Sequence, residues 1–182
     1  QSLRFDEATS ALDRTPAVNG DRDTWTVSVW VKRSGLGVIN HIIATDTTNQ
    51  THLRFNSDDK LNAEIYQGGY ALQLITTQVF RDPSAWYHIV WVYDSGNVTS
   101  GDRSKLYLNG ERITVFDTET YPSQDADSYF NSTATKMYVG WQNHSSNYPH
   151  KGYLADFYFI DGTALAADSF GELDSTTNQW KP

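Results

Sequence analysis

The Asn109-Gly110 dipeptide, set between two alternating runs, constrains this chain more than any other feature of the sequence. Residues 105–108 read KLYL and residues 111–113 read ERI. The dipeptide therefore predicts a two-residue β-hairpin, because both central residues of a type I′ turn need positive φ. The stretch before it, WYHIVWVYD at 86–94, predicts a long strand with bulky residues on both faces. We expect this strand to be covered on both sides or to lie under a binding face.

The rest of the chain repeats this pattern of short alternating strands. The run TWTVSVWVKR at 24–33 puts tryptophan and three valines on one face and Trp30 on the other. Further strands are expected at 2–5, 38–45, 51–57, 60–66, 71–80, 137–142 and 152–162, a single helical turn at 81–85, and polar loops at 6–23 and 117–135. The pattern predicts an all-β sandwich or barrel. The alternation assigns these residues to its interior: Val27, Val29, Val31, Leu106, Leu108, Val139 and Phe157.

Several of these runs carry a resemblance to a known family. The motifs are WYHIVWVYD, LYLNG, TWTVSVWVKR, MYVG at 137–140 and GYLADFYFIDGTALAADSFGEL at 152–173. They resemble laminin-G-like, concanavalin A-like jelly-roll domains, in particular those of tail or capsid-associated structural proteins of marine bacteriophages. The resemblance implies a two-sheet antiparallel jelly-roll sandwich. It says little about function, because this fold carries lectins, glycanases and interaction modules.

Length and charge narrow the possible functions. A chain of 182 residues predicts one domain, 1–182, which we expect to be excised from a longer chain. The net charge of −8 argues against a nucleic-acid or anionic-membrane partner, and no apolar run reaches membrane-spanning length. The absence of cysteine excludes disulfides and thiolate metal sites. We expect a virion or extracellular location.

The sequence carries no recognisable catalytic motif. A retaining glycosidase on this fold would place two carboxylates on one strand face, as in E-x-D-x-E, and that motif does not occur. The closest pairs, Asp125 with Asp127 and Asp21 with Asp23, lie in predicted loops. His88, on a strand face with Val90, is interpreted as a packed histidine rather than a base. We therefore predict that the domain is not an enzyme.

Calcium is the only cofactor that the sequence leaves open. Asp46 and Asp94 each end a predicted strand and offer the hard oxygen ligands that Ca²⁺ prefers. No pair of acids matches a ligand motif of the family.

The candidate ligand site lies in the loop after the 137–142 strand. Trp141, Asn143, His144 and Tyr148 combine stacking rings with an amide and an imidazole, the groups that bind sugar faces and hydroxyls. Tyr70 is the candidate second wall. In the competing interpretation, Trp141 follows the alternation of Met137 and Val139 into the core.

Two hypotheses about function follow. In the first, the domain is a non-catalytic carbohydrate-binding or adhesion module of a virion-associated protein, with a cell-surface or extracellular glycan as partner. In the second, it is a structural decoration or spacer domain that contacts other virion proteins and has no glycan ligand. A glycan-degrading enzyme is a distant third.

Overall fold

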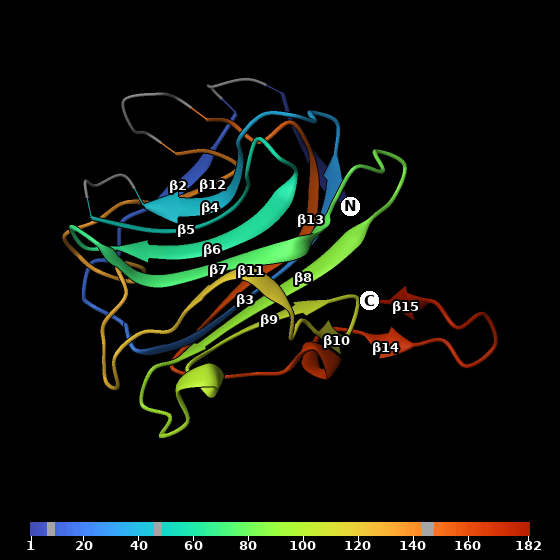
Figure 1. The fold of residues 1–182 in the computed structure, drawn as a ribbon. Coiled ribbons are helices and arrows are strands. Elements are labelled where there is room, and N and C mark those ends of the chain that lie inside the picture. The colour runs from blue at the N-terminus through green and yellow to red at the C-terminus, as the bar shows by residue number, and fades with distance from the viewer. Residues whose placement is uncertain (7–9, 46–48, 143–147) are drawn as a thin grey trace.

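The computed structural model describes residues 1–6, 10–45, 49–142 and 148–182. Two antiparallel sheets, one of six strands and one of seven, pack face to face as a sandwich (Figure 1). Within the described residues the helical segments are two 3₁₀ turns, η1 (Ser100–Asp102) and η2 (Ala167–Ser169). The prediction of an all-β, two-sheet antiparallel sandwich is therefore confirmed.

The six-stranded sheet contains both strands singled out in the sequence. Its order is β1 (Ser2–Phe5), β13 (Gly152–Asp161), β3 (Thr24–Arg33), β8 (Tyr87–Asp94), β9 (Ser104–Leu108) and β10 (Glu111–Arg112). β9 and β10 are joined by Asn109 and Gly110, with φ of 48° and 87°. The predicted hairpin turn with two positive φ values is confirmed.

The seven-stranded sheet is built around the meander of the middle of the chain. Its order is β11 (Phe116–Thr120), β7 (Tyr70–Val79), β6 (Lys60–Tyr66), β5 (Gln50–Phe55), β4 (Asn40–Thr45), β12 (Met137–Val139) and β2 (Leu12–Arg14). A separate hairpin of β14 (Glu172–Leu173) and β15 (Trp180–Lys181) extends away from the sandwich at the red end of the chain (Figure 1).

The core between the sheets is centred on aromatic rings. Trp25 and Trp91 come from neighbouring strands and meet edge to face at 4.7 Å. Each indole N–H is satisfied at 2.9 Å, by the hydroxyl of Ser128 or of Ser104. Of the predicted interior residues, Val27, Val29, Val31 and Leu106 are fully buried, while Leu108, Val139 and Phe157 are partly buried and pack against this core.

β8 is covered on both of its faces, as its sequence predicted. Its inner residues, including Ile89 and Trp91, belong to the core. Its outer residues Val90 and Val92 pack under the C-terminal segment, where they contact Ala167 and, among partly buried residues, Trp180. The outer face of the six-stranded sheet is thus partly closed by the chain's own C-terminal segment.

Four local expectations were wrong. The loop predicted at 6–23 contains β2, and the loop at 117–135 contains most of β11, because each short polar segment finds a sheet edge to pair with. Residues 81–85 form a turn rather than a helical turn, with both Ser84 donors bound to the Asp82 carboxylate. The strand at 137–142 ends at Val139, because Gly140 adopts a φ of 79° and a Cβ there would lie 2.3 Å from Phe5.

Replacing Gly110 tests the hairpin and its packing together. A Cβ at Gly110 would be strained by the positive φ and would lie 2.5 Å from the Trp180 ring. We expect Gly110→Val to lower the free energy of unfolding by more than about 1 kcal/mol, measured by urea denaturation.

Gly68→Val is the matched control. Gly68 also has positive φ, at 76°, but a Cβ added there would meet no atom within 4 Å. The control isolates backbone strain, and the excess loss at Gly110 reports the contact with Trp180. Equal losses of unfolding free energy in the two variants would contradict close packing of the Trp180 indole against Gly110.

Candidate functional site

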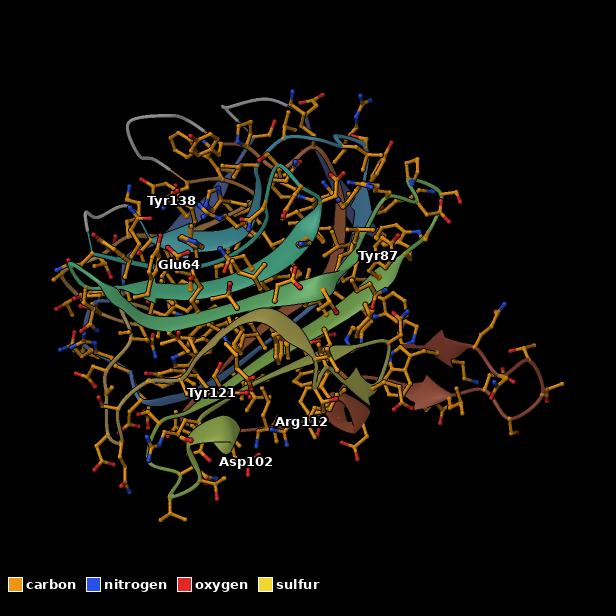
Figure 2. The ribbon with its side chains drawn as sticks, in the orientation of Figure 1. Glu64, Tyr87, Asp102, Arg112, Tyr121 and Tyr138 are labelled. Atoms are coloured by element: carbon orange, nitrogen blue, oxygen red, sulfur yellow. The ribbon has the colours of Figure 1, made fainter. Side chains whose placement is uncertain are left out.

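The outer face of the seven-stranded sheet carries a layer of polar side chains. In β5 and β6, apolar residues of the core alternate with His52, Arg54, Asn62 and Glu64. The register pairs His52 with Glu64 and Glu64 with Gln73 across three adjacent strands. Figure 2 labels Glu64 on this sheet. Period-two alternation therefore brings a row of polar groups together on one face.

Glu64 is the centre of this layer. Its carboxylate accepts hydrogen bonds from Asn62 Nδ2 at 3.1 Å and from Gln73 Nε2 at 3.2 Å. Arg54 Nη2 lies 3.7 Å and His52 Nε2 3.5 Å from the same carboxylate. Glu64 is buried, so its charge depends on these partners. They hold it in one orientation beneath the surface.

Burial and charge set the protonation of this layer. Burial alone would raise the pKa of Glu64, but the neighbouring His52 and Arg54 and the hydrogen bond from Asn62 outweigh it, and the pKa lies well below its ordinary value. Burial also lowers the pKa of His52. At neutral pH the layer therefore contains an anionic Glu64, a cationic Arg54 and a neutral His52.

Two predicted site residues, Tyr70 and Tyr148, lie beside this polar layer. His41, which meets Tyr148, pairs with Arg54 across β4 and β5, and burial lowers the pKa of the Arg54 guanidinium. Tyr70 is 55% exposed and meets Tyr66 edge to face at 5.4 Å. Tyr148 is half-buried, and its ring lies 5.9 Å from that of His41. We call Tyr66, Tyr70 and Tyr148 the tyrosine rim.

A hollow of ≈ 390 Å³ opens beside Tyr148. Its walls include Gly37, Val38 and Lys151. The wall at Gly37 is fixed by its backbone N–H, which donates to Asp59 Oδ1 at 2.8 Å, and Lys151 donates its backbone N–H to Asn40 Oδ1 at 2.9 Å. The hollow is thus held by buried polar contacts at the end of the sandwich.

Trp141 lies on the outer side of the seven-stranded sheet. Its ring meets Tyr138 edge to face at 5.1 Å, and Figure 2 labels Tyr138 on β12. The next residue, Gln142, donates to Gln50 Oε1 at 2.8 Å. Trp141 is half-buried and does not join the core residues, so the interpretation that places it inside is wrong.

Three of the remaining predicted site residues cannot be compared with the structure. Asn143, His144 and Asp46 lie outside the described residues. Asp94 ends β8 in the six-stranded sheet, where its Oδ2 accepts a hydrogen bond from Asn97 Nδ2 at 3.4 Å. Among the described residues no group of three or more acids and histidines is placed to hold a metal ion. Calcium stays a prediction.

His52, Arg54 and Glu64 were missed as candidates for the site. Their signal was the same alternation that predicted the strands, since each of these polar residues is followed by an apolar core residue: Leu53, Phe55 or Ile65. Finding them requires knowing that β5, β6 and β7 are neighbours in one sheet and which face is turned outward.

The family comparison agrees with this architecture. Residues 6–169 match the concanavalin A-like lectin/glucanases superfamily, in its laminin-G type, and the chain belongs to this family. No curated protein matches the chain in sequence. No helix of the described residues is long and apolar enough to cross a membrane.

Solved structures share the fold at low sequence identity. The carbohydrate-binding module CBM40 of the Ruminococcus gnavus IT-sialidase, bound to α2,3-sialyllactose, has a TM-score of 0.64 and 15% identity, covering 93% of each chain. Domain 4 of the arabinanase AbnA from Geobacillus stearothermophilus, in complex with arabinotriose, has a TM-score of 0.58 and 13% identity, covering 90% of this chain and 84% of that one. Tailspike protein 2 of the Escherichia coli O157:H7 bacteriophage CAB120 has a TM-score of 0.57 and 13% identity, covering 93% of this chain and 23% of that one.

The buried histidines make stability depend on pH. Burial lowers the pKa of His52, and burial followed by the charge of Arg33 lowers that of His150 to about 3, from 6.5. The unfolded chain takes up protons below about pH 6.5 while the folded histidines stay neutral, so stability falls as the pH falls. We expect a loss of up to about 1.4 kcal/mol per pH unit for each histidine between pH 6 and 5.

Urea denaturation at pH 7, 6 and 5 measures this slope. His150→Leu removes one of the protons that the unfolded state takes up, so the slope should become shallower than in the wild type. A stability that does not change with pH, or an unchanged slope in the variant, would count against a neutral buried His150.

Proposed function

We propose that this domain is a non-catalytic carbohydrate-binding module that takes its glycan at the tyrosine rim and the loop beside it. The observation that carries the proposal is the position of these rings beside the polar layer: Tyr70 against Tyr66, and Tyr148 against His41, which pairs with Arg54 next to the buried Glu64. Exposed rings next to oriented polar groups suit the two sides of a sugar, its C–H face and its hydroxyls. The proposal also includes Trp141, Asn143 and His144, which the sequence predicted for this loop.

Each part of the site has a separate task. Tyr70 and Tyr148 offer ring surface to a sugar face, and Arg54, one-fifth exposed, donates hydrogen bonds to its oxygens. Glu64 holds Arg54 in place, so that little side-chain entropy is lost on binding. The glycan ligands named for the sialidase module and the arabinanase domain support a glycan as the ligand class.

Binding is tested with a glycan array, run with calcium and with a chelator. For any glycan retained, we expect Tyr148→Ala and Tyr70→Ala to weaken binding at least about tenfold, or about 1.4 kcal/mol, because each removes a ring whose apolar surface the sugar would bury. Loss of binding in chelator would support calcium as a cofactor.

Tyr158→Ala is the matched control. Tyr158 is an exposed tyrosine on β13 of the six-stranded sheet. The Tyr158→Ala variant should bind the glycan with the affinity of the wild type. Wild-type affinity in both Tyr148→Ala and Tyr70→Ala, with unchanged melting temperatures, would exclude the tyrosine rim as the site.

We further propose that the parent protein is virion-associated and that the domain acts in adhesion at the virion surface. The support is the resemblance of its strand motifs to phage structural proteins and the shared fold of a phage tailspike. The alternative is a decoration or spacer domain that contacts other virion proteins. A wild-type domain that retains no glycan on the array would favour that alternative.

We predict that the domain hydrolyses no β-glucan or galactan. A retaining mechanism needs two carboxylates about 5–5.5 Å apart. The described side chains in contact with Glu64 are His52, Arg54, Asn62 and Gln73, and none of them is a carboxylate.

A reducing-end assay measures this directly. No turnover is expected from the wild type. Turnover that is lost in Glu64→Gln but kept in Glu119→Gln, an exposed control on β11, would show that the domain is an enzyme.

A further inference from the structure

Three tryptophans gather on the outer face of the six-stranded sheet, on the other side of the sandwich from the tyrosine rim. Trp30 on β3, Trp86 just before β8, and Trp180 on β15 line a hollow of ≈ 300 Å³. The same three line a neighbouring hollow of ≈ 700 Å³. Trp86 is 36% exposed, and Trp30 and Trp180 are half-buried. We call the two hollows together the tryptophan cleft.

His88 fixes two of the three indoles. Its ring stacks with Trp30 at 5.0 Å and with Trp180 at 5.9 Å, and its Nδ1 accepts the indole N–H of Trp180 at 2.8 Å. Because an indole N–H only donates, the proton of a neutral His88 lies on Nε2, which is 2.9 Å from Ser28 Oγ. Burial lowers the pKa of His88 to about 4, so this arrangement holds at neutral pH.

The backbone around Trp180 is shaped to receive the indole. A Cβ at Gly110 would lie 2.5 Å from the ring, and one at Gly171 would lie 2.8 Å from it. The absence of a side chain at both positions lets the ring sit against the β9–β10 hairpin. The cleft is therefore a rigid surface rather than a set of loose exposed rings.

A distorted residue places a carboxylate at the cleft. Asp156 lines the smaller hollow and lies in a bulge of β13, where the register with β3 shifts between Ala155 and Tyr158. Its φ is 46°, a left-handed conformation that side chains rarely adopt within a strand. Bulges of this kind re-aim a side chain. The charge of Asp156 also partly offsets the lowering of the His88 pKa by burial.

We propose that the tryptophan cleft is a second glycan-binding site, and that it takes a neutral oligosaccharide of pyranose sugars. Indole faces stack on the C–H faces of such sugars, and carboxylate and amide groups accept and donate hydrogen bonds to their hydroxyls. Asp156 lies at one end of the cleft, and Asn109 and Glu111 lie at the other. Lys181 also lines the smaller hollow, but its ammonium is paired with Glu172 and Asp174. The two carboxylates of the cleft, in a chain of net charge −8, therefore disfavour uronic or sialic acids.

The polar groups also favour a sugar over a proline-rich peptide. A polyproline segment docks on tryptophan-lined grooves and presents carbonyl oxygens, which only accept hydrogen bonds. Asp156 and Glu111 offer acceptors, which repel carbonyls but pair well with the hydroxyl donors of a sugar.

Titration calorimetry with defined probes tests the site. Cellohexaose, mannohexaose and chitohexaose represent neutral chains, hexagalacturonate an acidic chain, and decaproline a peptide. We expect at least one neutral hexasaccharide to bind the wild type, and Trp86→Ala to weaken that binding at least tenfold with little change in melting temperature, because Trp86 is exposed. Tyr148→Ala should leave it unchanged, which separates this site from the tyrosine rim.

Three results would overturn the proposal. They are no binding of any neutral hexasaccharide, wild-type affinity in Trp86→Ala, and binding of decaproline in competition with the sugar. Binding that is lost in Tyr148→Ala and kept in Trp86→Ala would assign the glycan to the tyrosine rim alone.

Asp156→Gly tests the carboxylate against a purely structural role. Glycine adopts the left-handed conformation without strain, so the melting temperature should rise. Binding of the neutral hexasaccharide should fall at least tenfold, because the carboxylate is gone. The control is Asp125→Gly, an exposed residue with φ of 58° outside the cleft, which should raise the melting temperature and leave binding unchanged. Wild-type binding in Asp156→Gly would refute a role for the carboxylate in recognition.

Discussion

The buried ion pair of Arg33 and Asp59 links the two sheets at one end of the sandwich. Arg33 ends β3 of the six-stranded sheet, and Asp59 lies in the turn between β5 and β6 of the other sheet, with 2.9 Å between Nη2 and Oδ1. The guanidinium also donates to the carbonyl of Gly35 and lies over the ring of Phe55. Removing one partner of such a pair leaves a buried charge and typically costs about 3–5 kcal/mol.

The same ion pair also holds the loop that forms one wall of the hollow beside Tyr148. Asp59 adopts a φ of 66° and accepts hydrogen bonds from Gly37 N–H and from Arg81 Nε as well as from Arg33. Gly37 forms a wall of the hollow beside Tyr148. The hollow therefore depends on a contact inside the sandwich, and the loops around it are held by a scaffold that is rigid for reasons unrelated to ligand binding.

The two outer faces of the sandwich differ in chemistry: one buries a charged group, and the other has an apolar surface that must be covered. On the seven-stranded sheet, a buried carboxylate, Glu64, is compensated by hydrogen bonds and by Arg54. On the six-stranded sheet, the outer face of β8 is apolar near Val90 and Val92, and the C-terminal segment covers it. Trp180, near the end of this covering segment, donates its indole N–H to His88. Two binding surfaces on opposite faces would allow one domain to hold two sugar chains and gain affinity by avidity.

The sequence by itself determined the strands and their faces. Alternation in residues 24–33 identified the core face of β3, and the bulky residues on both faces of 86–94 predicted that β8 is covered on both sides or lies under a binding face. Asn109-Gly110 identified the turn, because all these signals depend on neighbours along the chain. It also pointed to Tyr70 and Tyr148, whose ring chemistry suits a sugar. Only the tertiary structure decided that β2 and β11 pair at sheet edges, that Trp141 packs outward against Tyr138, and that Glu64 collects partners from three strands. Those outcomes depend on which strands become neighbours across the sheets, and that is set by the packing of the whole chain.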